Sequence, residues 1–218
     1  MPALSPIPGV EAQQRDRSPE LFTEPFWVDL EPPVGREGES YPLLQEEAVD
    51  LLLEEARYVF SAIIYGFRFR YVPGDRAREM AEEFDLELIA EIERGDPRLS
   101  VLSTRVEDRR FHARLQYRPA DFQRSRRSAW MTTTIRRVAG EGEAPIWDGH
   151  DARIPAVERA IRQAVRNRLR EMTDNKPREA RGSVLLLEAP RISVRSGAYR
   201  AEVNVKVKVD ELRPHSVY

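Results

Sequence analysis

The sequence predicts an α+β fold, in which two main helices cover one face of a largely antiparallel sheet and the other face of the sheet is ionic. Two long segments, 43–65 and 153–172, carry apolar residues at the spacing of amphipathic helices. Several shorter segments alternate apolar and charged residues, which is typical of half-buried strands. Because strands and helices do not alternate strictly along the chain, a doubly wound parallel sheet is disfavoured.

The first expected helix spans residues 43–65. Pro42 precedes it, and acidic residues in its first turn suit the positive end of the helix dipole. Gly66 follows its last residue and ends it. Its mostly apolar face is formed by Leu44, Ala48, Leu51, Leu52, Glu55, Val59 and Ala62.

The segment after this helix predicts strands with opposite charges. An acidic strand over 85–93 and a basic strand over 110–118 each turn an apolar face inward. If they are neighbours, their outer faces form a lattice of ion pairs. The other elements expected in this part of the chain are a strand at 67–71, a short helix at 76–84 and a strand at 99–106.

In the second half of the chain, the clearest element is the helix over 153–172, whose arginines lie opposite its apolar face. A hairpin of two strands around Ser196-Gly197 is predicted to end the sheet. The remaining elements are a polar connector at 119–128, for which a helix is the alternative, a strand at 130–138, a loop at 140–151 and the hairpin strands at 183–194 and 198–209.

We expect three parts along the chain: a proline-rich extended arm over 1–42, a single α+β domain over 43–212 and a tail over 213–218. Half of the 16 prolines fall within the arm. Its aromatic residues Phe22, Phe26 and Trp27 have two interpretations. They pack on the arm's own domain, which we favour, or they dock onto another protein.

Charge is segregated along the chain although the net charge is only −2. Residues 1–56 carry 13 acidic and 3 basic residues, whereas residues 105–137 carry 10 arginines and 3 acidic residues. Arginine clusters of this kind suit nucleic-acid phosphates. The residues that would serve such binding are Arg124, Arg126, Arg127, Arg159, Arg162 and Arg166.

Several classes of protein are disfavoured by the composition. The sequence has no long apolar run, so no membrane span is expected. Without cysteine there are no disulfides and no thiolate metal sites, and only three histidines are present. No signal peptide is visible, so the cytoplasm is the default location and the cell envelope is the alternative if the start is trimmed. We find no motif for a cofactor, metal or catalytic residue.

A site of glutamate and histidine is the remaining enzymatic interpretation. Glu91 with His112 could act as acid and base, or Glu87, Glu91 and His112 could bind a metal. His150 lies in a second polar segment, Trp147-Asp148-Gly149-His150-Asp151, whose spacing matches no known ligand pattern.

The first functional hypothesis is therefore a non-catalytic protein-binding or assembly module of a bacterial-type soluble protein. It would use the aromatic arm and the charged sheet face to engage a protein partner or a second copy. The alternatives are a nucleic-acid-binding protein that uses the arginine clusters and a hydrolase-like enzyme with a Glu/His site.

Overall fold

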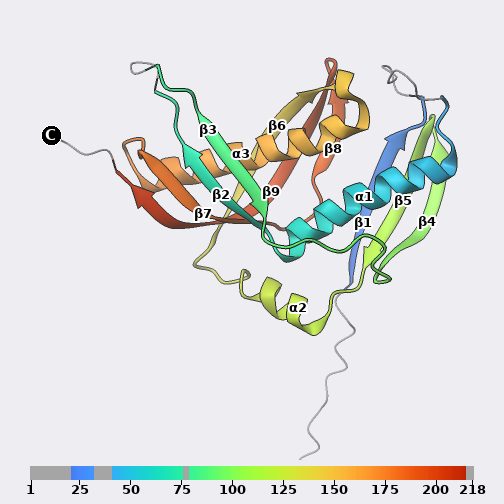
Figure 1. Cartoon of the computed structure of the whole chain (residues 1–218), viewed down its shortest axis with the longest axis horizontal. Helices are drawn as coiled ribbons and strands as arrows, with labels where there is room; N and C mark the ends of the chain where they lie inside the picture. Colours follow the sequence, from blue (N-terminus) through green and yellow to red (C-terminus); the bar gives the residue numbers. More distant parts are fainter. Residues whose placement is uncertain (1–20, 32–40, 76–78, 215–218) are drawn as a thin grey trace, which may run out of the picture.

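A computed structural model describes residues 21–31, 41–75 and 79–214 of the chain. It confirms the α+β class with antiparallel strands, which are distributed over two sheets (Figure 1). A three-stranded sheet has the order β1-β5-β4, and a six-stranded sheet has the order β3-β2-β7-β9-β6, with β8 also paired to β9. None of the helices within the described ranges is long and apolar enough to cross a membrane.

The three-stranded sheet includes a segment of the expected arm. Strand β1 (Phe22–Asp29) pairs with β5 (Arg110–Tyr117), and β5 pairs on its other side with β4 (Leu99–Glu107). The folded part of the chain thus contains residues ahead of position 43. Residues 1–20 and 32–40 of the expected arm and residues 215–218 of the expected tail lie outside the described residues.

Helix α1 (Gln45–Ile64) covers β1 and β5, and its second half is buried as predicted. The Phe60 ring lies 6.0 Å from the ring of Phe26 in β1 and 6.0 Å from that of Tyr117 in β5. Helix α2 (Asp121–Ser128), in the expected polar connector, is held through buried Gln123, whose amide donates to the Tyr117 hydroxyl at 2.9 Å. The core of this half of the molecule therefore lies between α1 and the three-stranded sheet.

The six-stranded sheet is covered by helix α3 (Arg153–Met172) on its apolar face. The apolar side of its longest strand, β9 (Ala198–Arg213), is buried as the alternation predicts. Strand β9 includes Arg213, the first residue of the expected tail. The other strands are β2 (Phe67–Val72), β3 (Glu83–Leu88), β6 (Arg136–Pro145), β7 (Glu179–Leu186) and β8 (Arg191–Arg195).

The region around β6 corrects the sequence prediction. The strand expected at 130–138 begins only at Arg136 and continues to Pro145, through the first half of the expected loop. Gly140 and Gly142, which we interpreted as loop residues, let α3 approach the sheet closely. A Cβ atom on Gly142 would lie 2.2 Å from the backbone nitrogen of Ala160 in α3. Close helix packing, and not a turn, explains these glycines.

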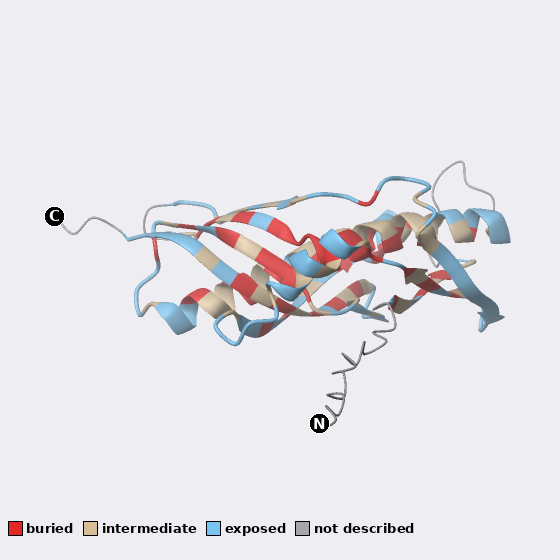
Figure 2. Ribbon diagram, turned by 90° about the horizontal axis from the view of Figure 1, so that it is seen from below, coloured by how far each residue is buried: buried red, intermediate tan, exposed pale blue. Residues whose placement is uncertain are grey.

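Two further elements differ from the prediction. The expected helix at 76–84 is wrong in its described part, because Asp75 and Met80 form an isolated bridge and β3 begins at Glu83. The strand expected at 183–194 is divided into β7 and β8, which both pair with β9. Buried residues gather between the helices and the sheets. Strand β4, the long pale blue arrow at the right edge of Figure 2, is exposed.

Candidate functional site

The ionic face of the six-stranded sheet consists of ion pairs, but with other partners than we expected. The acidic strand β3 and the basic strand β5 belong to different sheets, so the predicted lattice between them is wrong. Strand β3 pairs instead with β2, where Arg70 contacts Glu83 at 2.8 Å and Asp85 at 3.1 Å. Strands β2 and β3 follow each other along the chain and pair antiparallel, and consecutive strands are commonly neighbours in a sheet. On the same face, Lys208 contacts Asp210 at 2.8 Å.

The aromatic residues of the expected arm belong to their own domain. The side chains of Phe22 and Phe26 are buried, with exposed fractions of 8% and 4%. The indole of Trp27 is partly buried, and the guanidinium groups of Arg110 and Arg153 lie 4.4 and 4.6 Å from its centre. The interpretation in which the arm packs on its own domain thus describes these residues, and the two phenylalanines offer no surface to a partner.

The arginines of helix α2 mostly make contacts within the chain. Arg124 donates to the backbone oxygen of Pro119 and pairs with Asp121. Arg127 donates to the backbone oxygens of Ile63 at 2.8 Å and Leu187 at 3.0 Å. The guanidinium of Arg126 is exposed, 5.8 Å from the centre of the Tyr65 ring.

The arginine stripe of helix α3 is also engaged. Arg159 donates to the backbone oxygen of Glu143, and Arg166 binds both carboxylate oxygens of Glu82. Arg162 lies 3.9 Å from the same carboxylate. Burial favours the neutral form of Glu82, but the hydrogen bonds from Arg166 and Tyr71 lower its pKa below the usual value. The carboxylate therefore stays ionised and fixes this part of the stripe.

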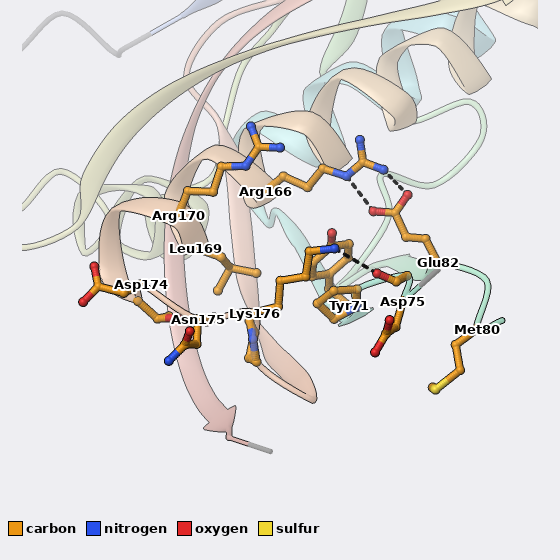
Figure 3. Close-up of a pocket in the computed structure, with 14 residues that line it drawn as sticks. Tyr71, Asp75, Met80, Glu82, Arg166, Leu169, Arg170, Asp174, Asn175 and Lys176 are labelled. Atoms are coloured by element: carbon orange, nitrogen blue, oxygen red, sulfur yellow. Dashed lines mark hydrogen bonds and ion pairs between the residues drawn. The ribbon is translucent and has the colours of Figure 1, made fainter. Parts of the chain in front are cut away.

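The Arg166–Glu82 pair forms one wall of a groove of about 750 Å³ (Figure 3). The groove lies between the end of α3 and the segment that joins β2 to β3. On its other side Lys176 donates to the backbone oxygen of Gly74 at 3.1 Å. The groove contains both acidic and basic side chains, and two of them, Arg166 and Glu82, bind each other.

The proposed pairing of Glu91 with His112 is not formed. The Glu91 carboxylate binds Arg57 of α1 at 2.9 Å, whereas His112 lies in β5, opposite Trp27 and Arg105. Burial and the charge of Arg105 lower the pKa of His112 below its usual value. Among the described residues no group of three histidine, aspartate or glutamate side chains could hold a metal ion.

His150 belongs to a buried cluster that the sequence did not reveal. Its Nε2 lies 3.3 Å from Oε2 of Glu55 in α1, and the 3₁₀ helix η2 (Ile146–Ala152) carries it there. Oε1 of Glu55 lies 3.1 Å from Arg153, at the start of α3. Arg153 also donates to the backbone oxygen of Trp27. The cluster therefore links α1, α3 and β1.

The charge state of the cluster follows from its contacts. Burial favours the neutral form of Glu55, but Arg153 and His150 lower its pKa below the usual value, so the carboxylate is ionised. One signal for the cluster was present in the sequence, because Glu55 is a lone carboxylate on the apolar face of the first helix. Its partners could not be found there, since they lie about a hundred residues away.

Among the strands that the structure describes, β4 is the most exposed. It is the last strand of its sheet, and every residue from Ser100 to Glu107 is exposed. The exposed fractions of its apolar side chains are 39% for Val101, 52% for Leu102 and 52% for Val106. We predicted this strand from its sequence but did not recognise it as an edge, since strand order is decided by the tertiary fold.

Comparison with known proteins places the chain in a family without identifying its activity. A protein-family model matches residues 9–215. The chain is also similar to an uncharacterized protein of Treponema pallidum (strain Nichols), with 28% identity over 198 residues, which are 89% of this chain and 82% of that protein. No solved structure matches the chain.

Proposed function

The chain belongs to the protein family whose model covers residues 9–215, and from this premise we propose that it is a non-catalytic protein-binding and assembly module. The free edge of strand β4 is the observation that carries the proposal. In the proposed assembly this edge pairs with the same strand of a second copy. The range that the family model matches includes all of β4.

Strand β4 has backbone hydrogen-bonding groups on its outer side that another strand could bind. Among the described residues it pairs with β5 only, so the N–H and C=O groups along its other side are open to another strand. Its length of nine residues is enough to bind an added strand. Addition of a strand to a free edge is a common way in which proteins recognise one another.

The side chains of β4 do little to prevent pairing. Edge strands are usually protected by proline, by charged side chains, by bulges or by a covering element. Strand β4 has no proline, and its two charged residues, Arg105 and Glu107, lie 3.2 Å apart and neutralise each other. A bulge between Val101 and Ser103 is its one protective feature, and the register is regular from Ser103 onward.

A second copy of β4 is the occupant that fits this edge. Leu102 and Val106 lie two positions on either side of Thr104. In an antiparallel pair centred on Thr104, Leu102 faces Val106 of the partner subunit. Apolar cross-strand pairs of this kind contribute roughly 0.2–1 kcal/mol each. The strand is thus complementary to itself, as the interface of a two-fold dimer requires.

The two copies would form one continuous six-stranded sheet from their three-stranded sheets. Both α1 helices would lie on the same face of it, next to the apolar side chains of β4. The pairing therefore removes the open β4 edge of each copy and covers apolar surface of β4 that is exposed in the single chain.

The test is sedimentation velocity of the full chain over a concentration series up to about 100 μM, which detects dimers of micromolar affinity. We expect a dimer for the unchanged protein and a monomer for Leu102→Lys. Phe122→Lys is the matched control, because Phe122 is also exposed, at 62%, but lies in α2. It should remain dimeric, and both variants should keep the circular dichroism of the folded chain.

Two results would end the proposal. One is a monomer over the whole concentration range. The other is a dimer that Leu102→Lys and Phe122→Lys leave equally intact or weaken equally, since association would then not depend on β4.

A further inference from the structure

Helix α2 and the turn after it form a projecting surface, and we propose that this surface binds an anionic lipid bilayer. The helix lies at the lower edge of the molecule in Figure 1 and packs against α1. It carries exposed apolar side chains and arginines together, and proteins that bind to the surface of a membrane combine these two kinds of group. A bilayer presents a plane, so a projecting segment reaches it without a cleft. The proposal does not depend on the pairing of β4, which is a separate element.

Two large apolar side chains of this surface are exposed. The exposed fraction is 62% for Phe122 in α2 and 43% for Met131, which lies three residues after the helix. Single exposed apolar residues are common on protein surfaces, so these two do not identify a site by themselves. The charge of the same segment supplies the second observation.

The segment that contains both residues is strongly positive. Residues 118–137 include six arginines and one acidic residue, Asp121, although the net charge of the whole chain is −2. Asp121 is paired with Arg124. Three further arginines of the segment are exposed and have no acidic partner among the described residues: Arg118, Arg126 and Arg136. Their charge is therefore available to an anionic surface, to which each basic residue adds attraction.

Phe122 and Arg126 lie on the same side of α2, because they are four residues apart. A neighbouring side of the helix faces the core, where Gln123 is 1% exposed and Arg127 donates to the backbone oxygen of Ile63 at 2.8 Å. The helix is thus held by one side and leaves an aromatic ring and a guanidinium exposed on another.

A bilayer surface is the partner that uses both groups. The guanidinium of Arg126 suits the phosphate of a lipid headgroup, while the ring of Phe122 suits the boundary between headgroups and acyl chains. A single-stranded nucleic acid would also bind the arginines, but its bases stack on aromatic rings, and Met131 has none. The Met131 side chain suits the acyl chains instead.

The test is cosedimentation of the full chain with vesicles of phosphatidylcholine, with and without an equal part of phosphatidylglycerol. We expect binding to the mixed vesicles only, and loss of this binding in about 1 M salt, where the Debye length falls to about 3 Å. Phe122→Ala should weaken the binding about tenfold. Arg126→Gln should weaken it about fivefold.

Matched changes elsewhere on the surface are the controls. Trp147→Ala removes an aromatic side chain that is 66% exposed in η2, and Arg195→Gln removes an exposed arginine of β8. Both should leave vesicle binding unchanged. All of these variants alter exposed residues, and each should keep the circular dichroism of the folded chain.

A fluorescent dye reports which surface meets the lipid. The chain has no cysteine, so Phe122→Cys and Trp147→Cys each provide a single site for an environment-sensitive dye. We expect the dye at position 122 to become brighter with the mixed vesicles, because it leaves water, and the dye at position 147 to stay unchanged.

Four results would overturn the proposal: no binding to the mixed vesicles; equal binding to vesicles of phosphatidylcholine alone; binding that neither Phe122→Ala nor Arg126→Gln weakens; or an equal response of the dye at the two positions. In the first case, binding of single-stranded RNA would assign the surface to a nucleic acid.

Discussion

Strands β3 and β4 each end a sheet, but they present opposite surfaces to other chains. Strand β3 carries Glu83, Asp85 and Glu87 on one face, and all three are exposed. Strand β4 exposes apolar side chains, and its two charges bind each other. Like charges along an edge discourage another strand from pairing; β3 carries three acidic residues, two of which contact Arg70 of β2, whereas the two charges of β4 have opposite signs. The six-stranded sheet is therefore closed at β3, while the three-stranded sheet can be extended at β4.

Helices α1 and α3 also differ in how completely each covers its sheet. Helix α3 rests directly on β6, where Gly140 and Gly142 leave no room for a side chain. Helix α1 covers β1 and β5 but leaves the apolar residues of β4 in solvent. One sheet is thus complete within the chain, and the other has a third strand that the chain itself does not cover.

The largest expected effect tests whether β1 is part of the covered region. Phe26→Ala should lower the free energy of unfolding by about 3–5 kcal/mol, because it empties a buried site next to Phe60. Urea denaturation followed by circular dichroism measures this. Phe122→Ala, in which an exposed phenylalanine is truncated, should change the value by less than about 0.5 kcal/mol. Similar losses in the two variants would show that β1 is not a core strand.

The next prediction concerns the link between the two covering helices. Glu55→Gln should lower the free energy of unfolding by about 3 kcal/mol, because Arg153 keeps a buried charge without its partner. Urea denaturation at neutral pH measures this. Loss of less than about 1 kcal/mol would mean that the cluster does not hold α1 to α3.

The same residue predicts a pH dependence. Burial favours the neutral carboxyl, but Arg153 and His150 hold the pKa of Glu55 below its usual 4.5. Its stabilising contribution is therefore present above the pKa of the unfolded chain and is lost as the pH falls through the lower pKa of the folded chain. Below pH 4.5 the unchanged protein should lose stability more steeply than Glu55→Gln. Parallel curves of unfolding free energy against pH would contradict this.

A smaller effect tests the contact between α3 and β6. Gly142→Ala places a methyl group against the backbone of α3 and should cost about 1–3 kcal/mol. Glu141→Ala removes an exposed side chain from the same strand, together with its pairing to Arg200, and should cost less than about 1 kcal/mol. Thermal unfolding of the two variants compares these costs, and an equal shift would mean that the helix can move away from the sheet.

The smallest effect on folding should come from the edge of β3. Asp85→Val should change the free energy of unfolding by no more than about 0.5 kcal/mol, because the site is on the surface. It should nevertheless create a second edge that can pair, and sedimentation should then show species larger than those of the unchanged chain. Asp85→Glu keeps the charge and is the control. Identical sedimentation of the two variants would show that charge does not protect this edge.

The residue pattern predicted correctly those helices and strands that bury the same face along their whole length. Helix α3 was expected over 153–172 and spans Arg153–Met172, because its apolar residues all face one sheet. Strands β5 and β9 were found for the same reason, since their alternation matches a sheet with one dry face. The buried second half of α1 was also predicted from its lack of polar residues.

The sequence prediction failed for residues whose role depends on contact with a segment far away in the sequence. Gly140 and Gly142 resemble loop residues until α3 is placed on them. We favoured packing of Phe22 and Phe26 on their own domain, but the pairing of β1 with β5 that buries them was not predicted. The partners of Glu91 and of His150 come from α1, so their neighbours in the sequence gave no indication of them.

Local residue patterns were enough to predict the α+β class, the two main helices and the polarity of most strands, because hydrophobic periodicity and helix-stop signals act over a few residues. The order of the strands, the open edge of β4 and the partners of the buried charges became evident only in the folded chain. These depend on contacts between segments tens of residues apart, and such contacts are selected by the packing of the whole chain.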